Sequence, residues 1–265
     1  MTPLPREFAE PLQRLGEGCP LASRVSWHTA TASTNADAAA LADAGAPEGC
    51  VVLADLQTAG RGRLGRSWSS PAGTGIYASV LFRPEPRVAR MLTIGAGVAL
   101  AEAIETVAGI VPVLKWPNDV YLGGGSQSGR KVAGILAEAG VSGGETWVVM
   151  GFGINVLPAS FPHELALRAT SLESELGRPV DRGELFAECL VRLAARYADL
   201  CAGRCRGVVD AWRQRASPTF GRPVEWVDEG TAKAGVVRDI DDGGALLVDT
   251  EAVIVRVVSG ELRWP

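Results

Sequence analysis

Residues 60–68 read Gly-Arg-Gly-Arg-Leu-Gly-Arg-Ser-Trp and connect two apolar segments, 51–56 and 76–82, whose patterns predict strands. This stretch, called the arginine loop below, contains three arginines within six residues: Arg61, Arg63 and Arg66. Glycine frees the backbone from the usual φ limits, and crowded guanidinium groups bind phosphate or carboxylate oxygens through paired hydrogen bonds. The pattern predicts an anion-binding loop, and it is shared by solvated surface loops and nucleic-acid contacts.

The overall charge of the chain argues against some of the ligands that such a loop could bind. Its 265 residues include 26 basic and 30 acidic side chains, which gives a formal net charge of -4. The arginines are therefore a local exception on a mildly acidic protein, and we expect no nucleic-acid partner. The five cysteines are odd in number and have no CxxC spacing, which favours free thiols in a reducing compartment.

Two features of the sequence argue against export and membrane insertion. The first ten residues include acidic side chains and no apolar segment, so they predict no secretory signal. The most apolar stretch, 91–101, has eleven residues, whereas a helix that crosses a bilayer needs about 20. We therefore expect a cytoplasmic protein with no membrane partner.

Apolar spacing along the chain alternates between strand and helix patterns. Besides the two strands that flank the arginine loop, strands are predicted at 132–137 and 147–155. Helical spacing is found at 34–44, 91–109 and 181–203. These patterns indicate an α+β or α/β protein with a mixed sheet and flanking helices.

The pattern changes near residue 217 to short strands separated by tight turns. Strands are predicted at 223–227, 234–240, 245–249 and 253–258. The Asp-Asp-Gly-Gly sequence at 241–244 is a strong signal for a hairpin turn. We therefore expect two domains, a main one at 1–216 and a small barrel-like all-β one at 217–265.

Polar residues stand at the ends of several predicted strands and would meet if the sheet is mixed. They belong to Gln57 with the arginine loop, Lys-Trp-Pro-Asn-Asp at 115–119, Lys-Val-Ala-Gly at 131–134 and Gly-Phe-Gly-Ile-Asn at 151–155. Asp119 can bind Mg²⁺ or cap its own turn. Lys131 can reach solvent or face an anion in a cleft. Ser33-Thr34-Asn35 begins a helix, where it can act as a cap or favour an anion.

Several catalytic classes find little support in the sequence. The Gly/Ser-rich stretch 123–129 lacks the Gly-Lys-Ser/Thr that opens the helix of a P-loop, so we interpret it as a hairpin connection. His28 and His163 are the only histidines, and neither lies near a nucleophile motif. This argues against Ser/His/Asp or Cys/His catalysis and against a zinc site.

Taken together and in order, five segments resemble the biotin protein ligase family. They are Ser-Thr-Asn at 33–35, Gln-Thr-Ala-Gly-Arg-Gly-Arg-Leu-Gly-Arg-Ser-Trp at 57–68, Lys-Trp-Pro-Asn-Asp at 115–119, Lys-Val-Ala-Gly-Ile-Leu at 131–136 and Gly-Phe-Gly-Ile-Asn at 151–155. The resemblance implies a catalytic domain related to class II aminoacyl-tRNA synthetases, followed by an SH3-like C-terminal domain. Because about thirty residues precede Ser33, we expect the monofunctional type, without the N-terminal DNA-binding domain of bifunctional members.

The resemblance implies a two-step ligation. The carboxylate of biotin attacks the α-phosphate of Mg-ATP, which gives biotinyl-5′-AMP and pyrophosphate. The ε-amine of a lysine on a biotin carboxyl carrier protein or domain then attacks the acyl carbon, and AMP leaves. The implied small molecules are biotin, ATP and Mg²⁺, and the arginine loop would order over the adenylate to exclude water.

The resemblance also assigns roles to individual residues. The implied biotin site consists of Ser33, Thr34, Asn35, Gln57, Arg61, Gly62, Arg63, Lys131 and Gly134. The implied ATP site consists of Arg63, Arg66, Trp68, Asn118, Lys131 and Asn155. Lys131, Arg63 and Arg66 would act in catalysis by holding two anions together. Asp119 would contact Mg²⁺, and no general base for the acceptor lysine is evident.

Two other functions share parts of this pattern. A lipoate or octanoate ligase or transferase has a related fold and also uses a strand lysine, but the Arg-Arg-x-Gly-Gly-Gly segment of such enzymes is absent from the sequence. A non-catalytic biotin sensor would bind biotin without modifying a carrier. For the ligase, we expect a monomer or a weak homodimer.

Overall fold

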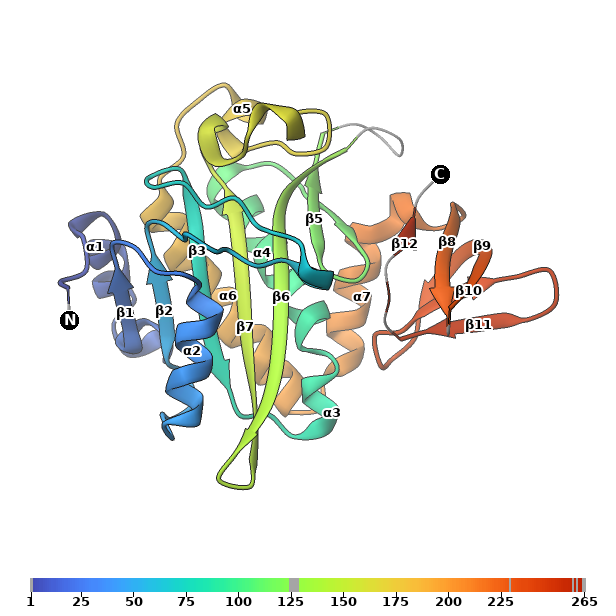
Figure 1. Ribbon diagram of the computed structural model, residues 1–265, viewed down its shortest axis with the longest axis horizontal. Coiled ribbons are helices and arrows are strands. Elements are labelled where there is room, and N and C mark those ends of the chain that lie inside the picture. Colours follow the sequence, from blue (N-terminus) through green and yellow to red (C-terminus); the bar gives the residue numbers. More distant parts are fainter. Residues whose placement is uncertain (1, 124–128, 229, 259, 261, 264–265) are drawn as a thin grey trace.

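Two β-sheets follow one another along the chain in the computed structural model, which describes residues 2–123, 129–228, 230–258, 260 and 262–263. The first sheet, with helices on both faces, forms the main body, and the second sheet stands at one side of it (Figure 1). The predicted α+β class, with a mixed sheet followed by a small all-β part, is confirmed.

The first sheet has seven strands in the order β1-β2-β3-β7-β6-β5-β4. They are β1 (Val25–His28), β2 (Val51–Ala54), β3 (Gly75–Phe82), β4 (Val113–Lys115), β5 (Asp119–Leu122), β6 (Arg130–Ser142) and β7 (Glu145–Asn155). Within the described residues, β1 and β2 pair in parallel, and the other neighbouring strands pair antiparallel. The hairpin connection predicted at 123–129 falls between β5 and β6, and its residues 124–128 lie outside the described part.

Helices cover both faces of this sheet. They are α1 (Arg6–Leu15), α2 (Thr34–Asp43), α3 (Pro86–Ala89), α4 (Leu92–Ala108), α5 (Leu172–Leu176), α6 (Arg182–Cys201) and α7 (Cys205–Ala216). Figure 1 shows α2 on one side of the sheet, called the front face below, and α4, α6 and α7 on the other side, called the back face. Among the helices of the described ranges, none has the length and apolar character to span a bilayer.

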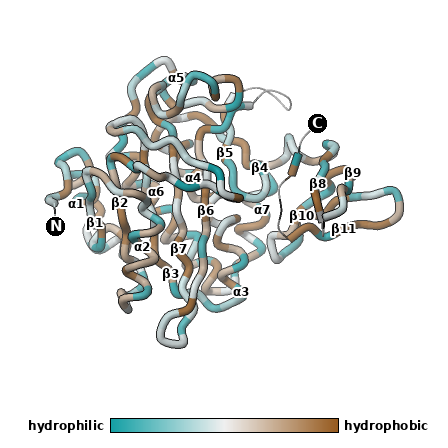
Figure 2. Tube along the Cα trace, in the orientation of Figure 1, coloured by the Kyte–Doolittle hydropathy of each residue, from teal (hydrophilic) through white to brown (hydrophobic). Residues whose placement is uncertain are grey.

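The back face of the sheet holds the larger hydrophobic core. Met150, Phe152 and Ile154 of β7 point there and are at most 4% exposed. The strands in the middle of the sheet are accordingly hydrophobic along most of their length (Figure 2). On the front face, a smaller cluster that includes Ala38 and Val149 holds α2 against the sheet. Because side chains alternate along a strand, neighbouring residues of β7 serve opposite faces.

Local signals explain where the main helices begin and end. α4 ends at Gly109, whose φ of 72° is the left-handed conformation that glycine adopts without strain. Asp181 caps the start of α6 with its side chain. Ser33 precedes α2, but its side chain makes no capping hydrogen bond. The backbone N–H of Thr34 instead donates to Gln57 Oε1 at 2.9 Å, so a residue beside the arginine loop caps α2.

The second sheet is antiparallel and has the order β11-β10-β9-β8-β12. Its strands are β8 (Pro223–Asp228), β9 (Thr231–Ile240), β10 (Leu246–Asp249), β11 (Ile254–Val257) and β12 (Leu262–Arg263). The turn predicted at 241–244 connects β9 to β10, and Asp241 Oδ1 accepts a hydrogen bond from the N–H of Gly243 at 2.9 Å. Trp116 Nε1 donates to Gly244 O at 2.9 Å, so the same turn joins the second sheet to the main body.

Candidate active site

Glycines open the front face of the β6–β7 hairpin. Gly134 lies directly opposite Gly153, and Gly151 follows on the same face of β7. A Cβ atom on Gly151 would lie 1.8 Å from Asn35 Oδ1, and one on Gly153 would lie 2.3 Å from Trp68 Nε1. Glycine at these positions therefore lets polar and aromatic side chains approach the sheet closely.

Asn35, at the start of α2, lies against this glycine face and is 5% exposed. Its Oδ1 accepts a hydrogen bond from Ser79 Oγ at 2.6 Å. Its Nδ2 donates to Leu136 O at 3.2 Å and to Glu138 Oε2 at 2.7 Å. Because both groups that face Nδ2 are acceptors, the orientation of the amide is fixed. The sequence had indicated Asn35 but not Glu138.

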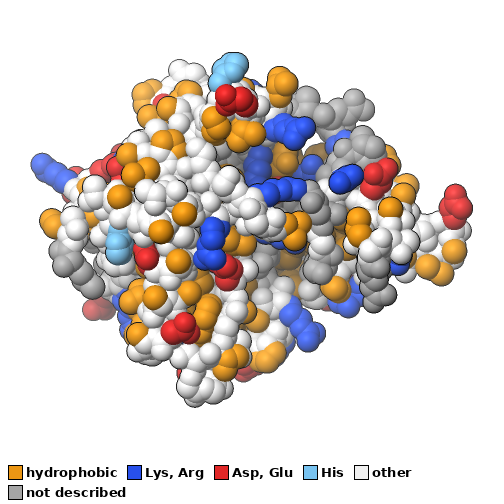
Figure 3. Space-filling model, in the orientation of Figure 1, with side chains coloured by type: hydrophobic (Ala, Val, Ile, Leu, Met, Phe, Trp, Pro, Cys, Tyr) orange, Lys and Arg blue, Asp and Glu red, His pale blue; other side chains and the backbone are white. Residues whose placement is uncertain are grey.

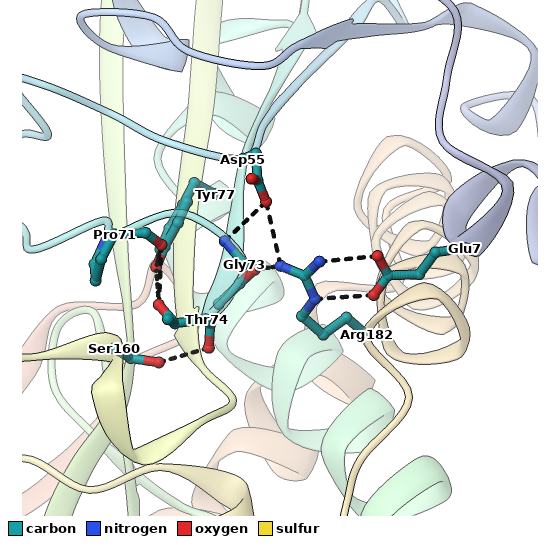
Figure 4. Close-up of polar contacts among 9 residues, drawn as sticks. Glu7, Asp55, Pro71, Gly73, Thr74, Tyr77, Ser160 and Arg182 are labelled. Carbon is teal, nitrogen blue, oxygen red and sulfur yellow. Dashed lines mark hydrogen bonds and ion pairs between the residues drawn. The ribbon is translucent and has the colours of Figure 1, made fainter.

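The base of the arginine loop is anchored by a partly buried network of polar groups. Asp55 Oδ1, just before the loop, accepts a hydrogen bond from the N–H of Gly73, just after it, at 2.9 Å. The same oxygen lies 3.4 Å from a guanidinium nitrogen of Arg182. Arg182 also donates two hydrogen bonds to Glu7 of α1, at 2.9 and 2.8 Å (Figure 4). Both ends of the loop are thereby fixed to α1 and α6.

The loop itself crosses the front of the sheet and contacts three parts of the molecule through its arginines (Figure 1). Arg61 forms an ion pair with Glu138 of β6, with an N···O distance of 2.8 Å. Arg63 donates to Asn118 Oδ1, in the turn between β4 and β5, at 3.0 Å. Arg63 also donates to the carbonyl of Gly260, in the C-terminal part, at 3.1 Å.

Lys131 lies on β6 beside the loop, with its ammonium between a carboxylate and an aromatic ring. Its Nζ is 2.5 Å from Asp119 Oδ1 and 5.4 Å from the centre of the Trp68 ring. Its backbone N–H donates to Arg168 O at 2.8 Å, and its carbonyl accepts from the N–H of Thr170 at 2.9 Å. The segment that contains Arg168 and Thr170 therefore holds the backbone of Lys131 in place beside the cleft.

Three adjoining cavities surround the contact between Arg63 and Asn118, and these two residues line all three. The first cavity, of about 50 Å³, lies over the glycine face. The second, of about 220 Å³, lies between the loop, the β4–β5 turn and the C-terminal part. The third, of about 290 Å³, lies between α4, β6 and the C-terminal part. Figure 3 shows Lys and Arg side chains around a hollow on this side of the molecule.

The structure brings most of the predicted site residues together, as expected for a mixed sheet. The first cavity is lined by the whole set assigned to biotin: Ser33, Thr34, Asn35, Gln57, Arg61, Gly62, Arg63, Lys131 and Gly134. The second cavity is lined by most of the set assigned to ATP, and by Asp119: Arg63, Arg66, Trp68, Asn118 and Lys131. Asn155 lines none of the three cavities. It is 3% exposed and donates to Thr170 O at 3.0 Å.

Lys115 also lines the second cavity, although its motif at 115–119 predicted no separate role for it. Burial lowers the pKa of Lys115 to about 8, and Asp119 acts in the opposite direction. The nearby charges of Arg222 and Lys131 lower this pKa further. Burial also lowers the pKa of the Arg63 guanidinium. The cavity therefore holds cations that are partly desolvated.

The residues present fit Mg²⁺ that arrives with a nucleotide. In nucleotide sites Mg²⁺ is bound by one or two carboxylates together with substrate phosphates, and Asp119 supplies one carboxylate in the second cavity. Within the described ranges, no group of three or more His, Cys, Asp or Glu residues is arranged to hold a metal ion by itself. The donor set therefore fits a shared ion rather than a metal centre built by protein alone.

The mixed sheet with its cation-lined front cleft, followed by a small all-β part, is shared with a known class of ligases. The chain matches the Biotin/lipoate A/B protein ligase family over residues 28–155 and the Biotin protein ligase C terminal domain over residues 219–262. It is 36% identical over 239 residues to the biotin–[acetyl-CoA-carboxylase] ligase of Mycobacterium tuberculosis, covering 88% of this chain and 85% of that protein. It is 38% identical over 228 residues to the enzyme of the same name from Paracoccus denitrificans, covering 82% and 91%.

A solved structure extends this similarity to the fold. The biotin protein ligase from Aquifex aeolicus in complex with biotin and ATP aligns with a TM-score of 0.79 at 30% identity, covering 91% of this chain and 99% of that one. With these relatives, which it matches over most of their length, the chain belongs to the biotin protein ligase family.

Proposed function

We propose that this chain is an ATP-dependent ligase that activates biotin as biotinyl-5′-AMP and transfers it to a lysine of an acetyl-CoA carboxylase carrier domain. The names of the relatives support the carboxylase as acceptor, and the Aquifex complex supports biotin and ATP as substrates. One observation carries the proposal for this chain itself. Arg61, Arg63 and Lys131 converge on a glycine-lined cavity that adjoins a second, cation-lined one.

In the first step, a carboxylate oxygen of biotin forms a bond to the α-phosphorus of ATP, and the bond from that phosphorus to pyrophosphate breaks. Both reactants are anions and repel each other, so fixed positive charge must hold them together. Lys131 and Arg63 line both cavities and are therefore placed at the junction. Mg²⁺ bound with the nucleotide would neutralise phosphate charge, and Asp119 would hold it.

Biotin would lie on the glycine face, with its ureido group near Ser33, Asn35 and Gln57. The first cavity measures about 50 Å³, whereas small-molecule pockets measure about 300–1,000 Å³. Trp68 covers Gly153, and its Nε1 is buried without a hydrogen-bond partner among the described residues. We therefore propose that Trp68 swings off the glycines when biotin enters, toward the second cavity, where its ring can pack on adenine.

In the second step, the uncharged amine of the carrier lysine attacks the acyl carbon, a C–N bond forms, the C–O bond to AMP breaks, and the amine loses one proton to solvent. The mixed anhydride is also open to attack by water. A closed arginine loop would exclude water from it, and the contacts of Arg63 with Asn118 and Gly260 support such closure.

The direct test incubates the purified chain with ATP, Mg²⁺, biotin and a carboxylase carrier domain, and detects the modified lysine by mass spectrometry. We expect ATP-dependent addition of one biotinyl group, and none to a carrier whose acceptor lysine is replaced by arginine. Replacing biotin by lipoate discriminates between the related activities. Transfer of lipoate in preference to biotin, or no transfer at all, would contradict the proposal.

Finer features of the protein follow the same proposal. We propose a cytoplasmic enzyme, monomeric or weakly dimeric, that uses no nucleic acid, which its net charge of -4 supports. We also propose that the catalytic domain spans 1–216 and the C-terminal domain 217–265, because α7 ends at Ala216 and β8 begins at Pro223. Light scattering tests the oligomeric state, and limited proteolysis tests the boundary.

A further inference from the structure

Glu138 joins two parts of the site although it lines none of the three cavities. It lies on β6 opposite Val149, whose side chain packs on the front face. Its Oε2 accepts hydrogen bonds from Asn35 Nδ2 at 2.7 Å and from an Arg61 guanidinium nitrogen at 2.8 Å. One carboxylate oxygen thereby connects the start of α2 to the arginine loop.

The contact with Asn35 controls how that amide faces the cleft. The carboxylate of Glu138 is the closer of the two acceptors at Asn35 Nδ2, since Leu136 O lies at 3.2 Å. Without the carboxylate of Glu138, the hydrogen bond to Leu136 O alone would hold Asn35 Nδ2 against rotation of the amide. Asn35 lines the first cavity, so rotation of its amide would exchange the positions of its donor and its acceptor beside the proposed biotin site.

The contact with Arg61 ties one edge of the loop to the sheet. The Arg61 side chain is 44% exposed and that of Glu138 is 33% exposed, so solvent weakens the ion pair. A pair of this kind can open to admit substrates and close again afterwards. Arg63 holds the loop to Asn118 and to Gly260, elsewhere in the molecule. Glu138 supplies an ion pair between the loop and β6, where Lys131 also faces the Trp68 ring.

We propose that Glu138 is a positioning residue of the ligation reaction. It closes the arginine loop over the adenylate through Arg61, and it fixes Asn35 against bound biotin. The proposal rests on the proposed function. It differs from the roles of the cavity-lining residues because Glu138 acts through its two partners and touches no substrate.

The first experiment uses Glu138→Gln, which keeps the shape of the side chain and removes its charge. Enzyme with biotinyl-AMP formed in place, without carrier, is chased with unlabelled biotin, and release of the adenylate is timed. We expect release to become about three- to tenfold faster, as for loss of a half-exposed ion pair and a charged hydrogen bond. The matched control is Glu145→Gln, at the start of β7 in the same hairpin and 74% exposed, which should release the adenylate at the wild-type rate.

Two further readouts separate positioning from general loss of structure. Raising the ionic strength from about 0.05 to about 0.5 M should speed release more in the wild type than in Glu138→Gln, because salt screens the ion pair that only the wild type has. In a double-mutant cycle on release, the combined effect of Arg61→Gln and Glu138→Gln should be smaller than the sum of the two single effects, because both substitutions remove the same contact. The midpoint of thermal unfolding should be the same for Glu138→Gln and Glu145→Gln.

The outcomes distinguish this inference from the function on which it rests. A wild-type enzyme that forms no biotinyl-AMP would overturn the proposed function. A wild type that forms it, with a Glu138→Gln variant that retains it equally long, would overturn the inference alone. Additive effects of Arg61→Gln and Glu138→Gln would also overturn it, because the carboxylate would then not act through the loop.

Discussion

The two faces of the β6–β7 hairpin are built from alternate residues of the same strands and have opposite properties. On the back face, Ile135, Phe152 and Ile154 are at most 4% exposed and belong to the main core. On the front face, Gly134 and Gly153 carry no side chain, and other parts of the chain supply the groups above them. Residues that stabilise the fold thus alternate with residues that form the site. Substitutions on the back face should mainly affect stability, and substitutions on the front face should mainly affect activity.

Lys131→Ala should have the largest effect on activity. Loss of the ammonium at the junction of the two cavities should lower biotin-dependent pyrophosphate release by about 1,000-fold, the scale for one preorganised group that stabilises a transition state. Thermal unfolding should change little, because the Lys131 side chain is 27% exposed and outside the core. A variant with near-normal pyrophosphate release would remove Lys131 from the first step.

Gly151→Ala adds one methyl group to the front face and should have the second-largest effect on activity. Its Cβ would lie 1.8 Å from Asn35 Oδ1, so Asn35 must move out of the position that Ser79 and Glu138 define. A displacement of about 1 Å in a substrate-positioning group costs about 100-fold, and we expect kcat/KM for biotin to fall by about that factor. Calorimetric titration with biotin checks the assignment, and unchanged affinity would contradict it.

Arg63→Gly should make the enzyme lose its intermediate. The substitution removes the hydrogen bonds of the loop to Asn118 and Gly260, each worth about 1 kcal/mol or slightly more. We expect release of free biotinyl-AMP to rise about tenfold and unrelated lysines to become biotinylated. A chase of the bound adenylate measures the first effect, and equal retention by variant and wild type would refute it.

Lys115 should give ATP binding a pH dependence, because its pKa is lowered to about 8 from an ordinary 10.5. Its positive charge is present below about pH 8 and is lost above it, so KM for ATP should rise as the pH increases through about 8. Lys115→Met should raise KM for ATP about fivefold at pH 7 by removing one charge from a partly desolvated site, and should abolish this pH dependence.

The same lowering of the pKa means that buried Lys115 reduces the free energy of unfolding. A lysine whose folded pKa is depressed binds fewer protons when folded, so its burial destabilises the protein below about pH 8, and this loss is relieved as the pH rises toward 10.5. Lys115→Met should therefore raise the melting temperature at pH 7 while it weakens ATP binding. A variant that melts lower and binds ATP normally would show that Lys115 is structural.

Ile154→Val on the back face should have the smallest effect on activity. It removes one methyl group from a fully buried side chain and should cost about 0.5–1.5 kcal/mol of unfolding free energy. Because Ile154 lines none of the cavities, kcat/KM for biotin should change less than about twofold. Denaturant unfolding and steady-state kinetics on one preparation test both statements, and a large kinetic effect would show that the faces are coupled.

The sequence predicted those parts of the fold in which apolar spacing is long and regular. The strands β3 and β7 and the helices α4 and α6 were found close to their observed bounds. The helix α1 was missed because Pro11 interrupts a mostly polar segment. The strands β4 and β5 were missed because three and four residues are too few to show a period.

The site was predictable where its residues belong to quoted motifs and not where distant residues meet. Glu138 lies in the more exposed half of β6, where small residues on both sides give no pattern that indicates a site. It meets Asn35 across 103 residues of sequence. Asn155 is a polar residue at the end of a strand, which predicts a place at the cleft. In the structure it donates to the carbonyl of Thr170, whose loop covers it. No local pattern reveals which loop will fold back over a strand end.

The pairing of Glu7 with Arg182 gives the amino end of the chain a mechanical connection to the reaction (Figure 4). Arg182 in turn contacts Asp55, just before the arginine loop. Neutralising Glu7 would remove a charged partner of Arg182 and leave Asp55 to carry more of its charge. Substitutions in α1 can therefore alter the base of the loop, although α1 lines none of the three cavities.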